Sequence, residues 1–496
     1  MSEVTTTQQE DIEEKRRLIF ERINHIVLQN LNKTNTDSTV KIRSYSKEDI
    51  RRFNEAPDKS QKQLREISNY LFITSPHYRR LIHHFSLMPT FDFAIVPYAV
   101  KKTKSNKKMF EQTFYNISEY LNAMNLKYEI PKIMINCFKE DTFFGYVYSN
   151  LSTFFIRKLD SQYCAISSIE NGLLVFQYDF SYFTNRKDKL EEYGEEFTQK
   201  YKIYEKDKKQ RWQELELKNT CCFKVNDEEL RFSVPPFSGV FESVMEVDEF
   251  KKLNLNKEKI NNYKIIFEKI PLNIKDGDVD SFLVSLDEAL KFHSMTASAI
   301  GDQVGLALTP FDINTVDFKT SATAESNKVN EALENLWGSA GVASGLMGSD
   351  KANSGSIIQM SIRNDEAISF RLLRQIEKWV NYRISNFNTE NFKFKMEFLN
   401  STIYNFTELI TAYQGLATYG LPVLSKLNAL VGIQGEEIVN LNYLENEILG
   451  LQSKFIPLAN SHSTNVNDTG GRPTADGVSD SKDKTVDGDT NADRVK

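Results

Sequence analysis

Residues 338–355 read GSAGVASGLMGSDKANSG and separate two stretches whose apolar residues recur at helical spacing. Five glycines and four serines in these 18 residues predict a flexible loop. Loops of this length without regular structure are usually functional. A helix, a long glycine loop and a second helix are therefore expected over residues 321–386.

The helices around this loop differ in character. The first, residues 321–337, has only a thin apolar stripe of Val329, Leu333 and Leu336, which is not the pattern of a helix in the middle of a monomeric core. The second is long and has a fuller core face, formed by Ile362, Ile368, Leu372, Leu373, Ile376, Trp379 and Val380. Upstream, residues 278–300 predict another helix, capped by Asp278 or Asp280, and residues 305–318 a short strand-like unit.

The rest of the chain mixes helices and strands. An aromatic and β-branched region, residues 129–183, predicts strands, with a hairpin turn at Asn171-Gly172. Ser75-Pro76 divides two expected helices. Further helices are expected at 9–32, 107–124, 185–211, 403–418, 422–430 and 435–449, a strand at 392–398, and a disordered tail at 459–496. The fold class is α+β and mainly helical.

Charge is distributed unevenly along the chain. Residues 276–356 hold twelve acidic and four basic residues, a net of −8 against −6 for all 496 residues. One interpretation is an acidic face that simply meets water. The other is a channel lining that repels phosphate, because neutralisation of phosphates by Lys and Arg is what makes nucleic-acid binding tight.

Signatures of catalysis and metal binding are missing from the sequence. No Gly is followed by Lys, which excludes a Walker A loop, and there is no H-E-x-x-H or G-x-S-x-G. Asp276–Asp280 resembles the start of an EF-hand, but Ser281 stands where the loop needs Gly. His83 and His84 point to different faces of a helix, so they are poor joint ligands. We expect no cofactor and no enzymatic activity.

The cysteines and Trp337 could take part in chemistry or binding, but we interpret them as structural residues. The four cysteines (Cys137, Cys164, Cys221 and Cys222) form no disulfide framework in a chain of this length, so buried reduced thiols are expected. Trp337 is expected to be a packing anchor, with base stacking as the alternative. No signal peptide or membrane span is predicted, and the protein is expected to be soluble and cytoplasmic when made.

Several stretches, taken in order, resemble the portal proteins of tailed bacteriophages. They are Ser44–Ile50 (SYSKEDI), Ser75–Ile82 (SPHYRRLI), Phe144–Tyr148 (FGYVY), Leu159–Cys164 (LDSQYC), Tyr178–Phe183 (YDFSYF) and Gly470–Pro473 (GGRP). None is a catalytic signature, and the resemblance lies in their co-occurrence over about residues 41–458.

The resemblance implies a ring of about twelve subunits with regions called wing, stem, clip, tunnel loop and crown. The regions fall as follows: an N-terminal helical arm (1–40), wing (41–275), first stem helix (276–300), clip (301–320), second stem helix (321–337), tunnel loop (338–355), wing helix and strand (356–402), crown (403–458) and tail (459–496). The implied channel residues are Glu325, Lys328, Glu331 and Glu334 in the stem and Gly341, Ser344, Gly345, Gly348, Ser349, Lys351 and Asn353 in the loop. Those of the clip are Thr309, Pro310, Asp312, Asp317 and Lys319.

By the same resemblance, double-stranded DNA passes through the bore at one capsid vertex of the virion. The terminase large subunit would dock during packaging, head-completion or adaptor proteins later, and major capsid and scaffolding proteins would surround the ring. Two alternatives remain open at this point: another structural head–tail ring protein, and a nucleotide-dependent enzyme of unknown type.

Overall fold

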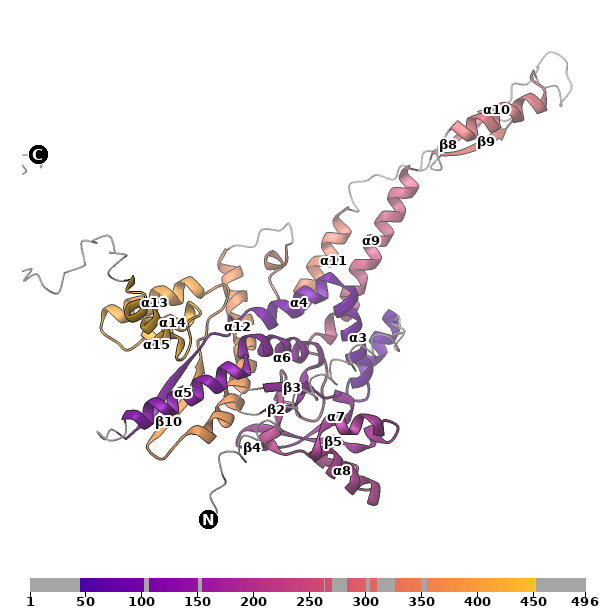
Figure 1. Ribbon diagram of the computed structural model, residues 1–496. Helices are drawn as coiled ribbons and strands as arrows, with labels where there is room; N and C mark the ends of the chain where they lie inside the picture. Colours follow the sequence, from indigo (N-terminus) through magenta and orange to yellow (C-terminus); the bar gives the residue numbers. More distant parts are fainter. Residues whose placement is uncertain are drawn as a thin grey trace, which may run out of the picture. The chain divides into compact units, whose positions relative to one another are not determined.

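The computed structural model describes residues 45–101, 107–149, 154–262, 264–269, 283–299, 304–309, 326–348 and 355–451 (Figure 1). The expected arm at 1–40 and tail at 459–496 lie outside these ranges. The chain divides into two compact units, Met1–Gly435 and Glu436–Lys496. Each unit is described by itself.

Helices and strands alternate irregularly in the first unit, so the expected α+β class is confirmed. Its helices are α2 (Lys47–Glu55), α3 (Gln61–Thr74), α4 (Pro76–Leu87), α5 (Lys107–Met124), α6 (Leu126–Glu140), α7 (Leu190–Tyr193), α8 (Glu195–Lys206), α9 (Phe241–Asn262), α10 (Leu286–Ala299), α11 (Ser326–Ser339), α12 (Gly355–Ile384), α13 (Phe406–Thr418) and α14 (Leu424–Leu430). Its strands are β1 (Phe93–Val100), β2 (Thr142–Ser149), β3 (Phe154–Lys158), β4 (Cys164–Glu170), β5 (Leu173–Asp179), β6 (Trp212–Glu214), β7 (Thr220–Lys224), β8 (Lys264–Lys269), β9 (Val304–Thr309) and β10 (Phe392–Phe398).

The second unit contributes α15 (Glu437–Asn442), which continues into a π-helical turn over Tyr443–Ile448. Val439 and Tyr443 are exposed in it. None of the described helices of either unit is both long enough and apolar enough to span a membrane.

The main core of the first unit lies among α3, α4, α6 and α12. The predicted break at Ser75-Pro76 is confirmed: the Ser75 hydroxyl accepts a hydrogen bond from the backbone N–H of Tyr78, and Pro76 is the first residue of α4. Proline is favoured there because its missing N–H would have no partner in the first turn. Tyr78, Leu81, Ile82 and Phe85 are consequently buried on one face of α4.

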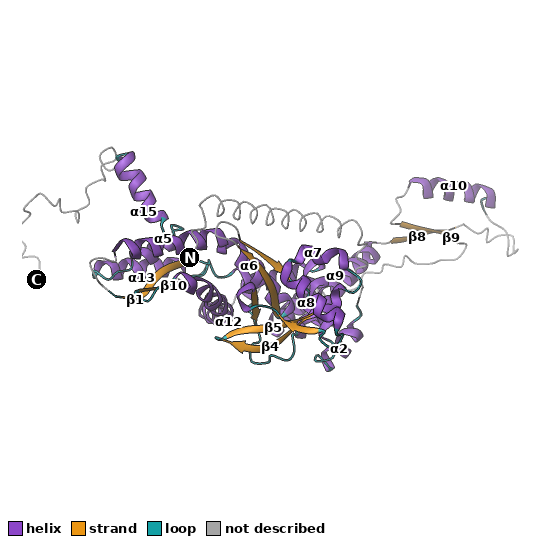
Figure 2. Ribbon diagram, turned by 60° about the horizontal axis from the view of Figure 1, so that its bottom comes forward, coloured by secondary structure: helices purple, strands orange, loops and turns teal. Residues whose placement is uncertain are grey.

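Strands occur as small sheets among the helices (Figure 2). One sheet has the order β3-β2-β7 and another β4-β5-β6, while β1 pairs antiparallel with β10 from far along the chain. The predicted hairpin is confirmed, since Asn171 and Gly172 join β4 to β5 with φ values of 52° and 72°. Asn and Gly tolerate this left-handed conformation better than other residues.

The helix that packs along α11 is α9, whereas the resemblance assigned the first stem helix to residues 276–300. The helix within 276–300 is α10, which packs on β9. It begins at Leu286, and the expected caps Asp278 and Asp280 lie outside the described residues. Ser285 takes the cap position instead, because its hydroxyl accepts a hydrogen bond from the N–H of Glu288 at 3.3 Å.

The expected strand in 305–318 is confirmed in part by β9, whose partner β8 lies in the range expected to be wing. The two strands pair in parallel, from Lys264 opposite Val304 to Lys269 opposite Thr309. Parallel neighbours need a crossover connection, and α10 lies within it. β8, α10 and β9 therefore form one β-α-β unit between α9 and α11 in the sequence.

Candidate functional site

The helices α9 and α11 pack together, and one end of each is buried in the main core; we call this buried end the root of the pair. Near the start of α9, Phe241, Val244 and Val247 are buried, and near the end of α11, Leu336 and Trp337 are buried. The Trp337 indole is 2% exposed and meets the His77 ring edge-on at 6.0 Å, so its predicted role as a packing anchor is confirmed.

Salt bridges from α2 fix the same part of α9. Nζ of Lys47 lies 2.7 Å from Glu249 and 3.6 Å from Glu246, and Arg51 pairs with Glu242. The root of α9 is thus held on one side by apolar packing and on another by charge.

Beyond this root, both helices become exposed. In α9, Leu253 and Leu255 are 61% and 63% exposed, and in α11, Lys328 and Glu331 are exposed. Exposed leucines are common singly, but two of them on the part of α9 beyond its buried end indicate a surface suited to another chain.

The flexible loop was expected over 338–355, but its described part, residues 338–348, is held by backbone contacts, which corrects the expectation for that part. The backbone N–H of Val342 donates to the Trp337 carbonyl at 3.1 Å, Gly341 has φ of +72°, and residues Ser344–Met347 form a 3-10 turn. The physical reason is burial: Val342 and Met347 are apolar residues in this glycine-rich stretch, and both pack into the core.

Polar contacts from α4 and α12 hold the loop base in place. Nη2 of Arg80 donates to the carbonyl of Leu346 at 3.1 Å, and the N–H of Ala343 donates to Oγ of Ser361 at 3.1 Å. Between α4 and the loop base lies a cavity of about 270 Å³, lined by Arg80, His83, His84, Leu87, Met88, Leu346, Met347, Ile403 and Tyr404. The loop base is therefore supported by residues distant in sequence.

His84 joins α4 to α12 next to this cavity. Its Nε2 lies 2.8 Å from Oδ2 of Asp365, and the two side chains are 6% and 3% exposed. His84 therefore links two helices within the folded subunit. Sequence reasoning missed Arg80, Ser361 and Asp365, because no local pattern signals a contact between positions this far apart.

The expected channel residues fall into three groups. On α11, Lys328 and Glu331 are exposed and Glu334 is half-buried; in the loop base, Gly341 and Gly348 are exposed and Ser344 and Gly345 half-buried. Thr309 ends β9. Glu325, Ser349, Lys351, Asn353, Pro310, Asp312, Asp317 and Lys319 lie outside the described residues. Lys328 and Glu331 lie near the start of α11 and the loop base follows its end, so the structure does not bring these two sets of residues together.

Ile368 of the predicted α12 core face is instead 44% exposed. Ile357 and Met360, earlier on the same helix, are also exposed, at 57% and 68%. The buried apolar residues of α12 begin at Leu372, where β7 and β10 cover the helix. The exposed N-terminal part of α12 follows the glycine loop directly.

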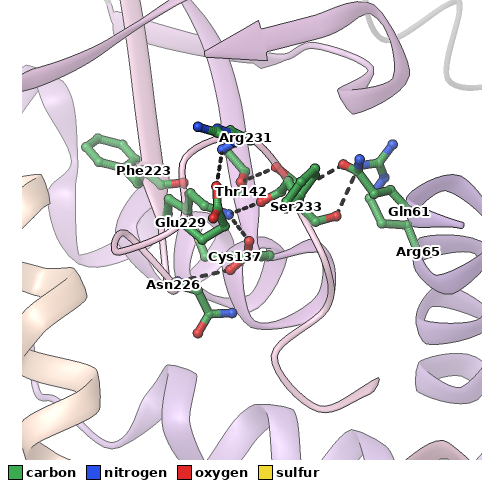
Figure 3. Close-up of polar contacts among 12 residues, drawn as sticks. Gln61, Arg65, Cys137, Thr142, Phe223, Asn226, Glu229, Arg231 and Ser233 are labelled. Atoms are coloured by element: carbon green, nitrogen blue, oxygen red, sulfur yellow. Dashed lines mark hydrogen bonds and ion pairs between the residues drawn. The ribbon is translucent and has the colours of Figure 1, made fainter. Parts of the chain in front are cut away.

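A second polar cluster lies at the junction of α3, α6 and β7 (Figure 3). Lys224 and Asp141 form an ion pair with side chains 0% and 1% exposed, and Lys224 also donates to the carbonyl of Phe232 at 2.7 Å. Burial raises the pKa of Asp141 to about 6, although Lys224 opposes the shift. Since an unpaired buried charge is costly, this pair must be kept intact in the folded chain.

The four cysteines are buried and unpaired, as predicted. Burial raises the pKa of each thiol well above its usual range, so they are inert at neutral pH. Over the described ranges, no group of three or more His, Cys, Asp and Glu side chains is placed to hold a metal ion.

No family model and no curated protein matches this sequence. Among solved structures, the chain is similar to a chain in a virion of a native gene transfer agent particle, with 10% identity and a TM-score of 0.39, covering 75% of this chain and 93% of that one. Two neck structures are similar as well. The neck of an empty particle, computed with C6 symmetry, gives 9% identity, a TM-score of 0.40 and coverage of 75% and 93%. The neck of a native particle, computed with C12 symmetry, gives 10%, 0.40 and coverage of 74% and 93%. Because identities and TM-scores are this low, function is argued below from the residues of this chain.

Proposed function

We propose that the chain is the portal subunit of a phage-like particle, a ring-forming protein whose central channel passes double-stranded DNA. The observation that carries the proposal is the α9–α11 pair. Its root is buried in the subunit core, while its other half exposes Leu253 and Leu255 of α9 together with charged residues of α11. In a closed ring one interface repeats around the axis, so a neighbouring copy would cover what a single chain leaves bare.

In this proposal the stem helices are α9 and α11, replacing the expected pair at 276–300 and 321–337. Glu331 is exposed on α11, in the part of the sequence with a net charge of −8. Repeated around a ring, such carboxylates would produce a negative field in the bore. DNA would then slide past the wall, because few cations are there to bind its phosphates.

The clip is the unit of β8, α10 and β9, which the chain forms between the two stem helices. Phe292 and Met295 of α10 are 67% and 62% exposed. Aromatic and Met side chains are enriched in protein interfaces. This unit would dock the terminase large subunit during packaging and head-completion or adaptor proteins afterwards.

The glycine loop would project into the bore as the tunnel loop, with its base held by Arg80 and Ser361. The β-rich part of the first unit would be the wing, next to major capsid and scaffolding proteins at one vertex of the virion. The portal hydrolyses nothing in this account; ATP turnover belongs to the terminase. A head–tail ring that does not conduct DNA is the competing function, and DNA transport separates the two.

An in vitro packaging assay tests the proposal with a charge reversal in the bore. Glu331→Lys should slow DNA transport while ring formation persists. Glu119→Lys is the matched control, because Glu119 is an exposed carboxylate on α5, outside the stem. Equal packaging by both variants would remove α11 from the channel wall, and packaging by particles lacking this protein would reject the portal role altogether.

A further inference from the structure

A basic pocket lies on the first unit, and none of its described lining residues belongs to α9 or α11. Its volume is about 440 Å³. It is lined by Asp58, Lys59, Gln61, Lys62, Arg65, Phe144, Ser161, Gln162, Cys164, Ala165, Ile166, Leu230, Arg231 and Ser233. Four of these side chains are cationic and one is acidic, in a protein whose net charge is −6. The proposed channel leaves this pocket without a role.

Arg65 is the most deeply placed of the four cations. Burial lowers the pKa of its guanidinium, and the nearby carboxylates of Glu140 and Asp160 offset only part of that effect. In the described part of the chain, the one hydrogen bond that the Arg65 guanidinium makes runs from Nη1 to the carbonyl of Ser233, at 3.4 Å (Figure 3). A guanidinium has five N–H donors, so most of the hydrogen-bonding capacity of Arg65 is unused.

The carboxylates around Arg65 are engaged with other donors. Glu140 accepts hydrogen bonds from Lys158 at 2.6 Å and Ser161 at 2.8 Å, and Asp141 is paired with Lys224. A charge buried without a partner is expensive. An oxyanion brought from outside would meet the donors of Arg65 in the geometry that guanidinium groups recognise.

The other three cations surround the pocket mouth. Lys59, Lys62 and Arg231 are exposed, and none of them forms an ion pair with any residue that the structure describes. The backbone N–H of Arg231 donates to Glu229, which leaves its guanidinium for other partners. The cations that line the pocket outnumber its one lining carboxylate, Asp58, and this balance favours an acidic ligand.

One wall of the pocket is an edge strand. β4 supplies Cys164, Ala165 and Ile166, and it pairs with β5 on one side only, with no described strand on the other. Edge strands offer unpaired N–H and C=O groups to an extended peptide. Phe144, Ile166 and Leu230 add apolar surface beside the cations. A phosphate ion alone would leave this wall and much of the volume unused.

We propose that this pocket binds an acidic, extended segment of a partner protein, with the carboxylates held by Arg65, Lys62 and Arg231 and the peptide backbone lying beside β4. The site would fasten the ring to a protein of the surrounding shell, independently of DNA passage. Since neither the α9–α11 pair nor the glycine loop takes part, this proposal can fail while the channel function stands, and the reverse.

Fluorescence anisotropy with the full-length protein tests the proposal. The probe is a fluorescein-labelled peptide of alternating Glu and Thr, compared with a peptide of alternating Gln and Thr. We expect the Glu peptide alone to bind, and Arg65→Gln or Lys62→Gln to weaken its binding about tenfold each, as expected for loss of a charge-assisted hydrogen bond. Lys202→Gln, at an exposed lysine of α8, is the control and should leave binding unchanged.

Thermal unfolding separates a binding role from a structural one. Without peptide, Arg65→Gln should keep or raise the Tm, because it removes a half-buried charge whose guanidinium makes a single long hydrogen bond. A lower Tm for Arg65→Gln together with undiminished peptide binding by Lys62→Gln would overturn the proposal. So would equal binding of the Glu and Gln peptides. Binding of inorganic phosphate or a short DNA duplex in preference to the Glu peptide would contradict it and assign the pocket to phosphate groups.

Discussion

Nε2 of His84 on α4 and Oδ2 of Asp365 on α12 lie 2.8 Å apart, and both side chains are nearly inaccessible to solvent. The two residues are separated by 281 positions in the sequence. Their contact fastens two helices that also hold the base of the glycine loop through Arg80 and Ser361. The loop base is therefore built on the core of the subunit.

The first prediction concerns this pair. His84→Ala leaves the Asp365 carboxylate buried without its partner, which should lower the free energy of unfolding by at least about 1–3 kcal/mol. Urea denaturation followed by fluorescence measures the loss. His83→Ala is the control, because His83 is only half-buried and makes an edge contact with Phe72; it should cost under about 1 kcal/mol. Equal losses would show that the pair adds no stability.

The second prediction concerns the glycines at the loop base. Gly341 and Gly348 have φ of +72° and +83°, so Gly341→Ala and Gly348→Ala should each destabilise the subunit by about 1–2 kcal/mol. Gly345 lies in a 3-10 turn, whose backbone L-residues adopt readily, so Gly345→Ala should be tolerated. Denaturation of the three variants checks the order of their stabilities.

Bulky residues at these glycine positions should also block DNA packaging while rings still form. Normal packaging by these variants would mean that the loop does not enter the bore.

The third prediction concerns the exposed part of α9 that carries Leu253 and Leu255. Leu253→Glu combined with Leu255→Glu should prevent ring assembly, because two exposed apolar side chains that a neighbour would bury become charged. Subunit stability should change by no more than about 0.5 kcal/mol per site. Mass photometry reports assembly, and Asn256→Asp, one residue further along α9, is the control. Rings formed normally by the double variant would place the subunit interface elsewhere.

The fourth prediction is a pH dependence at the junction of α4, α9 and α11. Nε2 of His77 lies 2.8 Å from Nζ of Lys251, and burial, with help from Lys251 and Arg80, lowers the pKa of His77, while Asp248 opposes this. The folded protein therefore binds fewer protons than the unfolded chain below the ordinary pKa of 6.5. The contribution of His77 to the free energy of unfolding is complete above pH 6.5, and it is lost as the pH falls through the lowered pKa of the folded state.

His77→Gln provides the comparison, because the Gln carbonyl can accept the hydrogen bond from Lys251 without titrating. Thermal unfolding between pH 7.5 and 5.5 should show a smaller loss of Tm for the variant than for the natural protein. A parallel loss in the two proteins would indicate that other groups, such as His83, account for the pH dependence.

The sequence predicts best those elements whose signals are local. The Ser75-Pro76 break, the Asn171-Gly172 hairpin and the helix Lys107–Met124 depend on a cap, a turn and a regular apolar stripe, and all three are present. The strand Phe392–Phe398 was expected for the same kind of reason and is also confirmed.

The missed elements lack such signals. α9 has no single apolar face, since Phe241, Val244 and Val247 enter the core whereas Leu253 and Leu255 face solvent. The apolar face of α9 does not continue along the whole helix, because α9 leaves the core partway along its length. α6 contains Pro131, and a proline inside a segment argues against a helix there. Pro131 is the sixth residue of α6, and burial of Ile130, Ile133 and Met134 outweighs the cost of the proline.

For the candidate site, the sequence identified the glycine loop and the acidic bias but could not identify what holds them. The described helix that packs along α11 is α9, and chain order alone could not have indicated this, because it does not distinguish α9 from α10. Likewise, Arg65 and Arg231 are unremarkable in the sequence, and only folding brings them to one pocket beside β4.

Cryo-electron microscopy of the purified full-length protein tests the central claim most directly. The account predicts a closed ring of many subunits, with α9 and α11 of every copy lining a bore wide enough for duplex DNA. A protein that stays monomeric, or a ring in which α11 faces outward or packs away from the bore, would contradict it.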